Sequence, residues 1–186
     1  MAGVKVGLKD LHVAILKNDG SYDAPQKFAR AIDATITPNT NSTTLYADDQ
    51  ASEVAESMGD VEVEINVDDL STEQYALLLG KTVNEDGVVI DKSDDVSPYL
   101  ALLFRSLKSN GEYRYVVLYK GKFSIPEDSY RTKADQVEFV NQTLSAKFVS
   151  KDDGEWRARV DSDDPTVSPQ VIDEWFDYVY GHMPIV

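Results

Sequence analysis

Residues 61–70, with the sequence VEVEINVDDL, restrict the fold more than any other segment, because apolar and acidic side chains alternate along them. Successive side chains of a β-strand point to opposite faces, so the alternation predicts a strand with one buried face and one acidic face. Antiparallel sheets often leave one face in water, so solvent is the simplest partner for the acidic row. That row consists of Glu62, Glu64, Asn66 and Asp68.

Two pairs of apolar segments predict that most of the chain is β as well. Residues 11–17 and 28–37 are separated by the turn-rich NDGSYDAP, which favours a first hairpin. Residues 97–107 and 112–125 flank Asn110-Gly111, the strongest short-range signal for a hairpin. Together with residues 61–70, these segments predict a mainly β (α+β) domain.

One short helix is expected at residues 72–79. Ser71 and Gln74 match a capping box, in which two side chains satisfy the first backbone N–H groups, and Gly80 follows where a helix ends. The helix is predicted to pack Tyr75, Leu78 and Leu79 onto the sheet. The remaining predicted elements are strands at 136–150 and 155–160 and a small surface hairpin around Gly87 at 82–90.

Residues 38–59 are predicted to be a long polar loop, because PNTNSTTLYADDQASEVAESMG shows little hydrophobic periodicity. A connection of this length without secondary structure is uncommon in a compact domain and is usually functional or disordered. A solvated surface loop and a contact with another molecule both remain open.

The C-terminal segment changes to helical spacing. Ser168 is the expected N-cap, Pro169 the first helical residue and Gly181 the residue just past the end. The preceding DSDDPTV is acidic, so residues 161–186 are interpreted as a tether and helical arm beside a domain at 1–160. Docking on its own body and docking on a neighbouring copy are equally open. The apolar face includes Ile172, Trp175, Phe176 and Val179.

Composition excludes several functional classes. The 186 residues carry 33 Asp and Glu against 18 Lys and Arg, and the net charge of -15 argues against tight binding to nucleic acid. The absence of cysteine excludes disulfides and thiol chemistry. Neither a signal-peptide core nor an apolar run of membrane-spanning length is found, which predicts a protein made and used without export. With two histidines and no nucleotide-binding or hydrolase motif, we expect no enzyme activity, metal or cofactor.

Basic residues gather in one part of this acidic chain. Residues 105–133 hold seven basic and three acidic side chains. A basic hairpin on an acidic body would suit head-to-tail self-association, although ordinary solvent-facing Lys and Arg explain the cluster equally well. The basic residues are Arg105, Lys108, Arg114, Lys120, Lys122, Arg131 and Lys133.

Five segments distributed along the chain between residues 7 and 169 carry a family resemblance. In chain order they are GLKDLHVAIL (7–16), TPNTNSTTLYADDQ (37–50), GDVEVEINVDDL (59–70), SPYLALLFRSLKSNGEYRYVVLYKGKF (97–123) and DSDDPTVSP (161–169). They resemble the major tail proteins, or tail tube proteins, of bacteriophages with long, flexible, non-contractile tails. The likeness extends over whole segments and includes no catalytic signature.

The resemblance implies a β-sandwich or split-barrel tail tube fold with a packed helix, in which six copies form a ring and rings stack into a tube for DNA. The long connection at 38–59 would then reach a neighbouring subunit or ring, and the acidic row would face the lumen and let DNA pass without adhering. The candidate contact residues in this connection are Asn39, Asn41, Leu45, Tyr46, Asp48, Asp49, Glu53 and Met58.

The expected partners are further copies of the chain, together with the tape measure, tail-tip and tail-terminator proteins, and no membrane. The expected location is the virion tail, assembled in the host cytoplasm. The alternative function is a monomeric β-sandwich module that binds a carbohydrate or a host protein. The alternative predicts a discrete ligand groove and no self-association.

Overall fold

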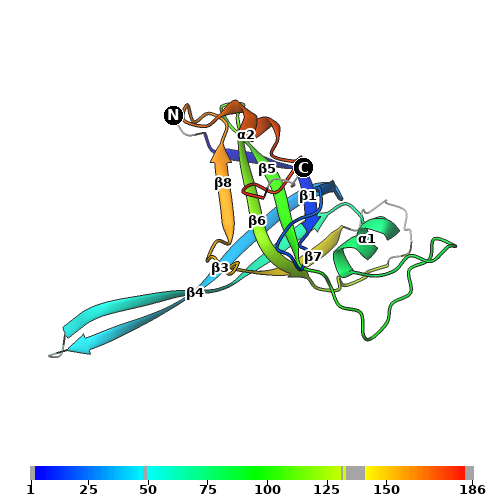
Figure 1. Cartoon of the computed structure of the whole chain (residues 1–186), viewed down its shortest axis with the longest axis horizontal. Helices are drawn as coiled ribbons and strands as arrows, with labels where there is room; N and C mark the ends of the chain where they lie inside the picture. Colours follow the sequence, from blue (N-terminus) through cyan, green and yellow to red (C-terminus); the bar gives the residue numbers. More distant parts are fainter. Residues whose placement is uncertain (1–2, 48–49, 131, 133–140, 183–186) are drawn as a thin grey trace.

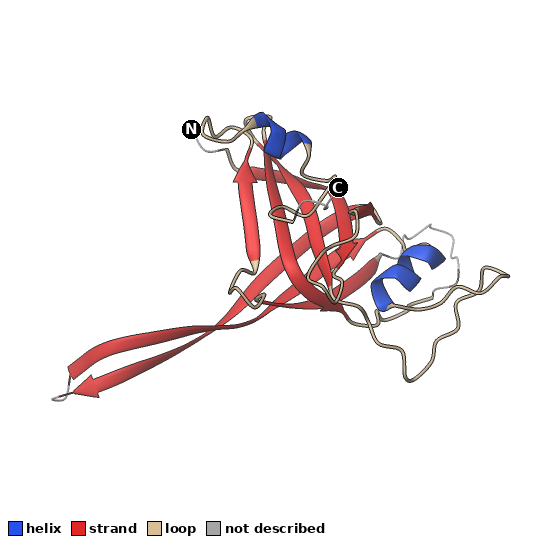
Figure 2. Cartoon of the chain, in the orientation of Figure 1, coloured by secondary structure: helices blue, strands red, loops and turns tan. Residues whose placement is uncertain are grey.

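Antiparallel strands dominate the protein, whose computed structural model describes residues 3–47, 50–130, 132 and 141–182, with the backbone alone at 45–47 and 50–53 (Figures 1 and 2). These residues form eight strands and two short helices. In chain order they are β1 (Lys5–Ile15), β2 (Gln26–Lys27), β3 (Ala31–Ala47), β4 (Gln50–Val67), α1 (Thr72–Leu79), β5 (Leu100–Lys108), β6 (Tyr113–Phe123), β7 (Gln142–Val149), β8 (Arg157–Asp161) and α2 (Pro169–Asp173).

All the strands belong to one curved sheet with the order β2-β1-β5-β6-β7-β4-β3. One edge of β6 is shared, because β8 pairs with its residues 114–118 and β7 pairs with its residues 120–123. The sheet therefore divides below β8, and β3 and β4 leave the body from this region (Figure 1). The mainly β prediction is confirmed, with all the described strands in one sheet.

The predicted hairpin between residues 11–17 and 28–37 is wrong. β1 pairs with the two-residue β2 and, along most of its length, with β5, in a register that places Val13 opposite Leu102. Long-range burial decides this pairing, since Leu11, Val13 and Leu102 are all completely buried in one apolar cluster. The second predicted strand instead becomes β3, which pairs with β4.

The predicted polar loop at 38–59 is also wrong, because β3 and β4 continue through it as one antiparallel hairpin up to the pair Ala47 and Gln50. Thr, which is frequent in this segment, has a high strand propensity even where neither face is buried. Hydrophobic periodicity fails to detect such a strand, because it depends on one buried face.

The β5–β6 hairpin is buried on both faces. On the concave side, Leu102 and Leu118 belong to the main core, which also contains Phe148 of β7. On the convex side, Leu103 and Val117 belong to a second cluster, covered by Trp175 and other residues from the C-terminal segment. Burial on both faces explains why the sequence here is a continuous apolar run rather than an alternation.

Helix α1 has the predicted position and caps. The Gln74 backbone N–H donates to the Ser71 hydroxyl at 3.3 Å, and the Ser71 N–H donates to the Gln74 side chain at 2.9 Å. Gly80 ends the helix at φ 67°, a left-handed conformation that glycine adopts without strain. The buried Leu78 and Leu79 attach the helix to the main core.

The C-terminal helix is shorter than predicted. It begins at Pro169 as expected but ends at Asp173, and residues 174–177 form turns. The segment EWFDYVY contains four aromatic residues and one valine, all of modest helix propensity, so packing decides its path. Trp175 and Val179 are almost fully buried against the convex side of the sheet, and the segment therefore docks on its own body.

Replacing Gly121 should destabilise the fold, because a β-carbon there would lie 2.5 Å from the Phe148 ring, which is completely buried. We expect Gly121→Ala to lower the free energy of unfolding by about 1–3 kcal/mol, as overpacked cores do. Chemical denaturation measures the change. Gly7→Ala is the matched control, since its nearest neighbour would be Leu107 at an ordinary 3.9 Å. Equal stability of the two variants would contradict the prediction.

Candidate functional site

The part of the chain that the structure describes offers no cluster of three or more His, Cys, Asp or Glu that could hold a metal ion. None of its helices is long and apolar enough to span a membrane. The features that remain as candidates are surfaces: an acidic sheet face, a projecting hairpin, a polar network and an arginine-lined groove.

The acidic row on β4 has the predicted orientation. Val61, Val63, Ile65 and Val67 are buried. The opposite face, however, is a mixed polar surface. Lys147 on β7 lies opposite Glu62, 3.6 Å from its carboxylate and 3.1 Å from that of Asp60. Further along this face, Asn66 donates to Asp33, accepts from Thr143, and lies between these two residues on neighbouring strands. The side chains of Glu62 and Glu64 are exposed, and those of Asn66 and Asp68 are half-buried.

The hairpin of β3 and β4 projects far from the body as a two-stranded ribbon (Figures 1 and 2). Along it, Thr40 faces Met58 and Thr43 faces Ala55. Its described side chains are almost all polar or exposed, including Val54 at 60% exposure. Of the candidate contact residues, Asn39, Asn41 and Met58 lie on this ribbon. Asp48 and Asp49, and the side chains of Leu45, Tyr46 and Glu53, lie outside what the structure describes.

Three of the basic candidates are bound within the chain. Arg105 lies 2.6 Å from Asp10, Arg114 makes two hydrogen bonds to Asp161, and the buried Lys108 contacts Asp161 and Asp163. The predicted basic patch is therefore largely neutralised by partners distant in sequence. Lys120 and Lys122 lie over the Tyr99 ring, and Arg131 and Lys133 fall outside the described residues.

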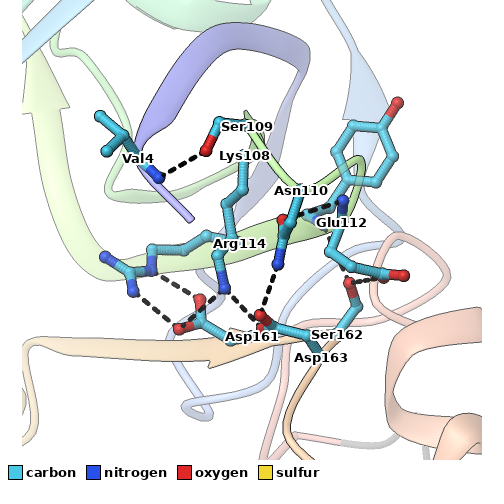
Figure 3. A network of polar contacts seen from close by, with 10 residues as sticks. Val4, Lys108, Ser109, Asn110, Glu112, Arg114, Asp161, Ser162 and Asp163 are labelled. Carbon is cyan, nitrogen blue, oxygen red and sulfur yellow. Dashed lines mark hydrogen bonds and ion pairs between the residues drawn. The ribbon is translucent and has the colours of Figure 1, made fainter. Parts of the chain in front are cut away.

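The pairs made by Lys108 and Arg114 belong to a polar network that fastens the acidic C-terminal tether to the β5–β6 turn (Figure 3). Asn110 donates to Asp163, and Ser162 donates to Glu112. The Arg114 guanidinium holds the pKa of Asp161 below its usual value of 3.8. The tether is thus held by several charge-assisted hydrogen bonds, which are stronger than neutral ones.

The C-terminal candidates contribute to the second cluster. Trp175 and Val179 are buried in it, while Ile172 and Phe176 are partly buried at its rim. The Phe176 ring also stacks on His12 of β1, with 4.4 Å between ring centroids. The indole N–H of Trp175 has no hydrogen-bond acceptor among the described residues.

An open groove of about 430 Å³ lies between β3 and β8 and was not anticipated from the sequence. Its floor is apolar, and Arg157 and Arg159 of β8 line one side. Partial burial lowers the pKa of the Arg157 guanidinium, and the charge of Arg159 acts in the same direction. The alternation in WRARV could have indicated that both arginines share a face, but not which face.

Comparison with known proteins identifies one family. A family model described as phage tail tube protein matches residues 4–164. No curated protein matches the chain. The matched range includes the acidic row, the projecting hairpin and the arginine-lined groove, and it ends within the acidic tether.

Removing the Asp161 carboxylate should lower the free energy of unfolding by an amount that depends on pH. Because its pKa is lowered in the folded state, Asp161 stabilises the protein near neutral pH, and this contribution disappears as the pH falls below about 4. We expect Asp161→Asn to lower the free energy of unfolding by about 1–2 kcal/mol at pH 7, allowing for partial exposure. Denaturation at pH 7 and pH 3 should show a smaller difference from the wild type at pH 3.

The matched control is Asp152→Asn, whose fully exposed carboxylate lies 3.5 Å from Lys120. This variant should unfold like the wild type at both pH values. An equal loss of stability for Asp161→Asn at pH 7 and pH 3 would show that its ionised form does not stabilise the fold.

Proposed function

Because the chain belongs to the phage tail tube protein family, we propose that it forms stacked rings of six copies whose bore carries DNA out of the virion. A tail tube protein is a structural component of the virion tail and not an enzyme. The observation that carries the proposal is the projecting hairpin of β3 and β4, which extends well beyond the body of its own chain (Figure 1).

The physics of the hairpin favours a contact with another subunit. A two-stranded ribbon is at best marginally stable alone in water, because it has no third strand and no apolar face to bury. Among the described residues, no third strand lies beside the backbone groups along either outer edge of residues 38–59. Binding to a neighbouring subunit or ring would supply these partners, and it would cover the exposed Val54 and Met58.

The acidic row of β4 is proposed to face the lumen or its rim. The chain carries a net charge of -15, and Glu62 and Glu64 are exposed on a continuous polar face. Like charge repels phosphate over a screening distance of about 10 Å at moderate salt, so an acidic wall lets DNA pass without binding. Lys147 reduces this charge locally without reversing it.

The tube would have to begin and end on other proteins of the virion. The proposal therefore includes contacts with the tape measure protein inside the tube, a tail-tip complex at which rings first assemble, and a terminator that closes the last ring. Assembly is proposed to take place in the host cytoplasm. The charges that hold the tether are already paired within the chain, so these contacts would use other surfaces.

Shortening the hairpin should abolish assembly while the body stays folded. Thr40 and Met58 face each other, so residues 41–57 can be replaced by Asn-Gly, which favours a two-residue turn. The stability of the body should change by no more than about 1 kcal/mol, because the removed residues lie outside the core. Light scattering with size exclusion and negative-stain microscopy should find rings or tubes for the full chain and only monomers for this variant.

The control for this variant keeps the length and composition of the hairpin by exchanging the facing residues, as Thr43→Ala with Ala55→Thr. It should assemble like the wild type. Normal rings from the shortened chain would exclude the hairpin as an essential contact. A wild-type chain that remains monomeric even with its tail-tip initiator would favour a monomeric binding module instead.

Reversing the charge of the acidic row should affect DNA passage rather than assembly. In virions built with Glu62→Lys and Glu64→Lys, tubes should form normally, but DNA ejection should slow because phosphate is now attracted to the wall. Microscopy of the tails and the rate of DNA release measure the two effects. The charge-matched control is Asp94→Lys with Glu127→Lys, two exposed positions on other elements. An unchanged rate of DNA ejection from assembled virions would contradict the proposal that the row faces the lumen.

A further inference from the structure

The groove between β3 and β8 holds two arginines that have no acidic partner among the residues that the structure describes. Arg157 lies over the Trp156 ring, 4.2 Å from its centroid, and the only charge that perturbs its pKa is the neighbouring Arg159. No carboxylate among the described residues forms an ion pair with either guanidinium, although the chain has 33 acidic residues. The other charged side chains of the groove are Lys5, Asp33 and Arg114.

Two of these other charges are already engaged. Arg114 is bound by Asp161, and Asp33 accepts a hydrogen bond from Asn66. The groove floor is apolar and includes Ile36, Phe104 and Val116, with the half-exposed Ile32 at the edge. A segment that fits here must therefore present carboxylates beside apolar side chains.

The chain itself carries such a segment in the turn at residues 84–88. Its tip is Glu85-Asp86, both exposed and without a basic partner among the residues that the structure describes. Beside the tip, Val88 is 51% exposed and Ile90 is 57% exposed. Acidic and apolar groups thus protrude together, as the groove requires.

Internal hydrogen bonds hold this turn in one conformation. The Asn84 side-chain oxygen accepts from the backbone N–H of Asp86 at 3.1 Å and of Val88 at 2.8 Å. Residues 80–99, between α1 and β5, form an excursion that carries this turn. At its base Lys81, whose side chain is 2% exposed, binds Asp91 at 2.6 Å and Asp95 at 3.1 Å. A preorganised turn loses little conformational entropy when it binds, so it is well suited to insertion into a groove.

We propose that the acidic turn 84–88 of one copy inserts into the groove of the next copy, with its carboxylates on Arg157 and Arg159. The excursion that carries the turn extends at one side of the molecule, whereas β8 lies on the other side (Figure 1). Two different surfaces on opposite sides make a head-to-tail contact, which closes into a ring or continues as a filament. This inference rests on the proposed assembly and assigns a contact within the ring, separate from the hairpin.

Charge reversal and rescue test the pairing. Asp86→Arg and Arg159→Glu should each raise the concentration needed for assembly by about tenfold or more, because each places like charges at the contact. The variant carrying both changes should recover most of the loss, since it restores opposite charges. Light scattering over a concentration series measures assembly, and thermal unfolding confirms that each variant is folded.

The matched controls are Asp94→Arg, on the same excursion but away from the turn, and Lys9→Glu, an exposed residue of β1 outside the groove. Both should assemble like the wild type. Wild-type assembly by Asp86→Arg and Arg159→Glu would overturn the inference while leaving the proposed tube intact. A wild-type chain that never assembles would instead contradict the proposed function itself.

Engineered cysteines provide a second readout that does not depend on charge, because the chain has no cysteine of its own. Val88→Cys and Ile32→Cys, prepared as separate variants and mixed under oxidising conditions, should form a disulfide-linked dimer of one chain of each kind. Replacing Val88→Cys by Val96→Cys, at another exposed apolar position on the excursion, should abolish this dimer. Failure of the combined charge variant together with absence of the Val88–Ile32 dimer would overturn the pairing.

Discussion

Burial of both faces of the β5–β6 hairpin is the constraint on which the rest of the structure depends. The hairpin forms locally around Asn110-Gly111, but its two apolar faces can only be covered by residues distant in sequence. Residues of β1, β4, β7 and helix α1 cover the concave face. Residues of the C-terminal segment cover the convex face. Close packing, such as that of Phe148 on Gly121, then fixes how the strands approach each other.

Polar interactions refine this arrangement where the core ends. At the turn end of the hairpin, Lys108 and Arg114 are surrounded by the carboxylates of Asp161 and Asp163, which orient the tether as it leaves β8 toward α2. Lys81 has the same role at the start of the excursion after α1. In both places a basic side chain holds an acidic segment in a defined path, and the acidic residues that remain without partners give the surface its negative charge.

How far the sequence predicts this structure depends on the range of the interactions involved. Helix α1 and the turn at Gly111 were predictable because their signals lie within a few residues of each other. The acidic strand was predictable because one of its faces is buried along residues 61–67. The continuation of β3 and β4 beyond residue 38 was not, because both faces of that ribbon are polar. The same limit applies to the candidate site, where Lys108 and Asp163 are 55 residues apart.

The distribution of charge relates these observations to assembly. Copies of a chain with net charge -15 repel one another, so self-association needs contacts that outweigh this repulsion at short range. Three basic side chains of the predicted patch, Arg105, Lys108 and Arg114, are already paired internally and cannot supply them. The groove with Arg157 and Arg159, which have no acidic partner among the described residues, is therefore the proposed place for attraction, since burial of its apolar side chains would add to the ion pairs there. Long-range repulsion with local attraction would also make assembly selective, because a copy in the wrong orientation meets a surface with an excess of negative charge.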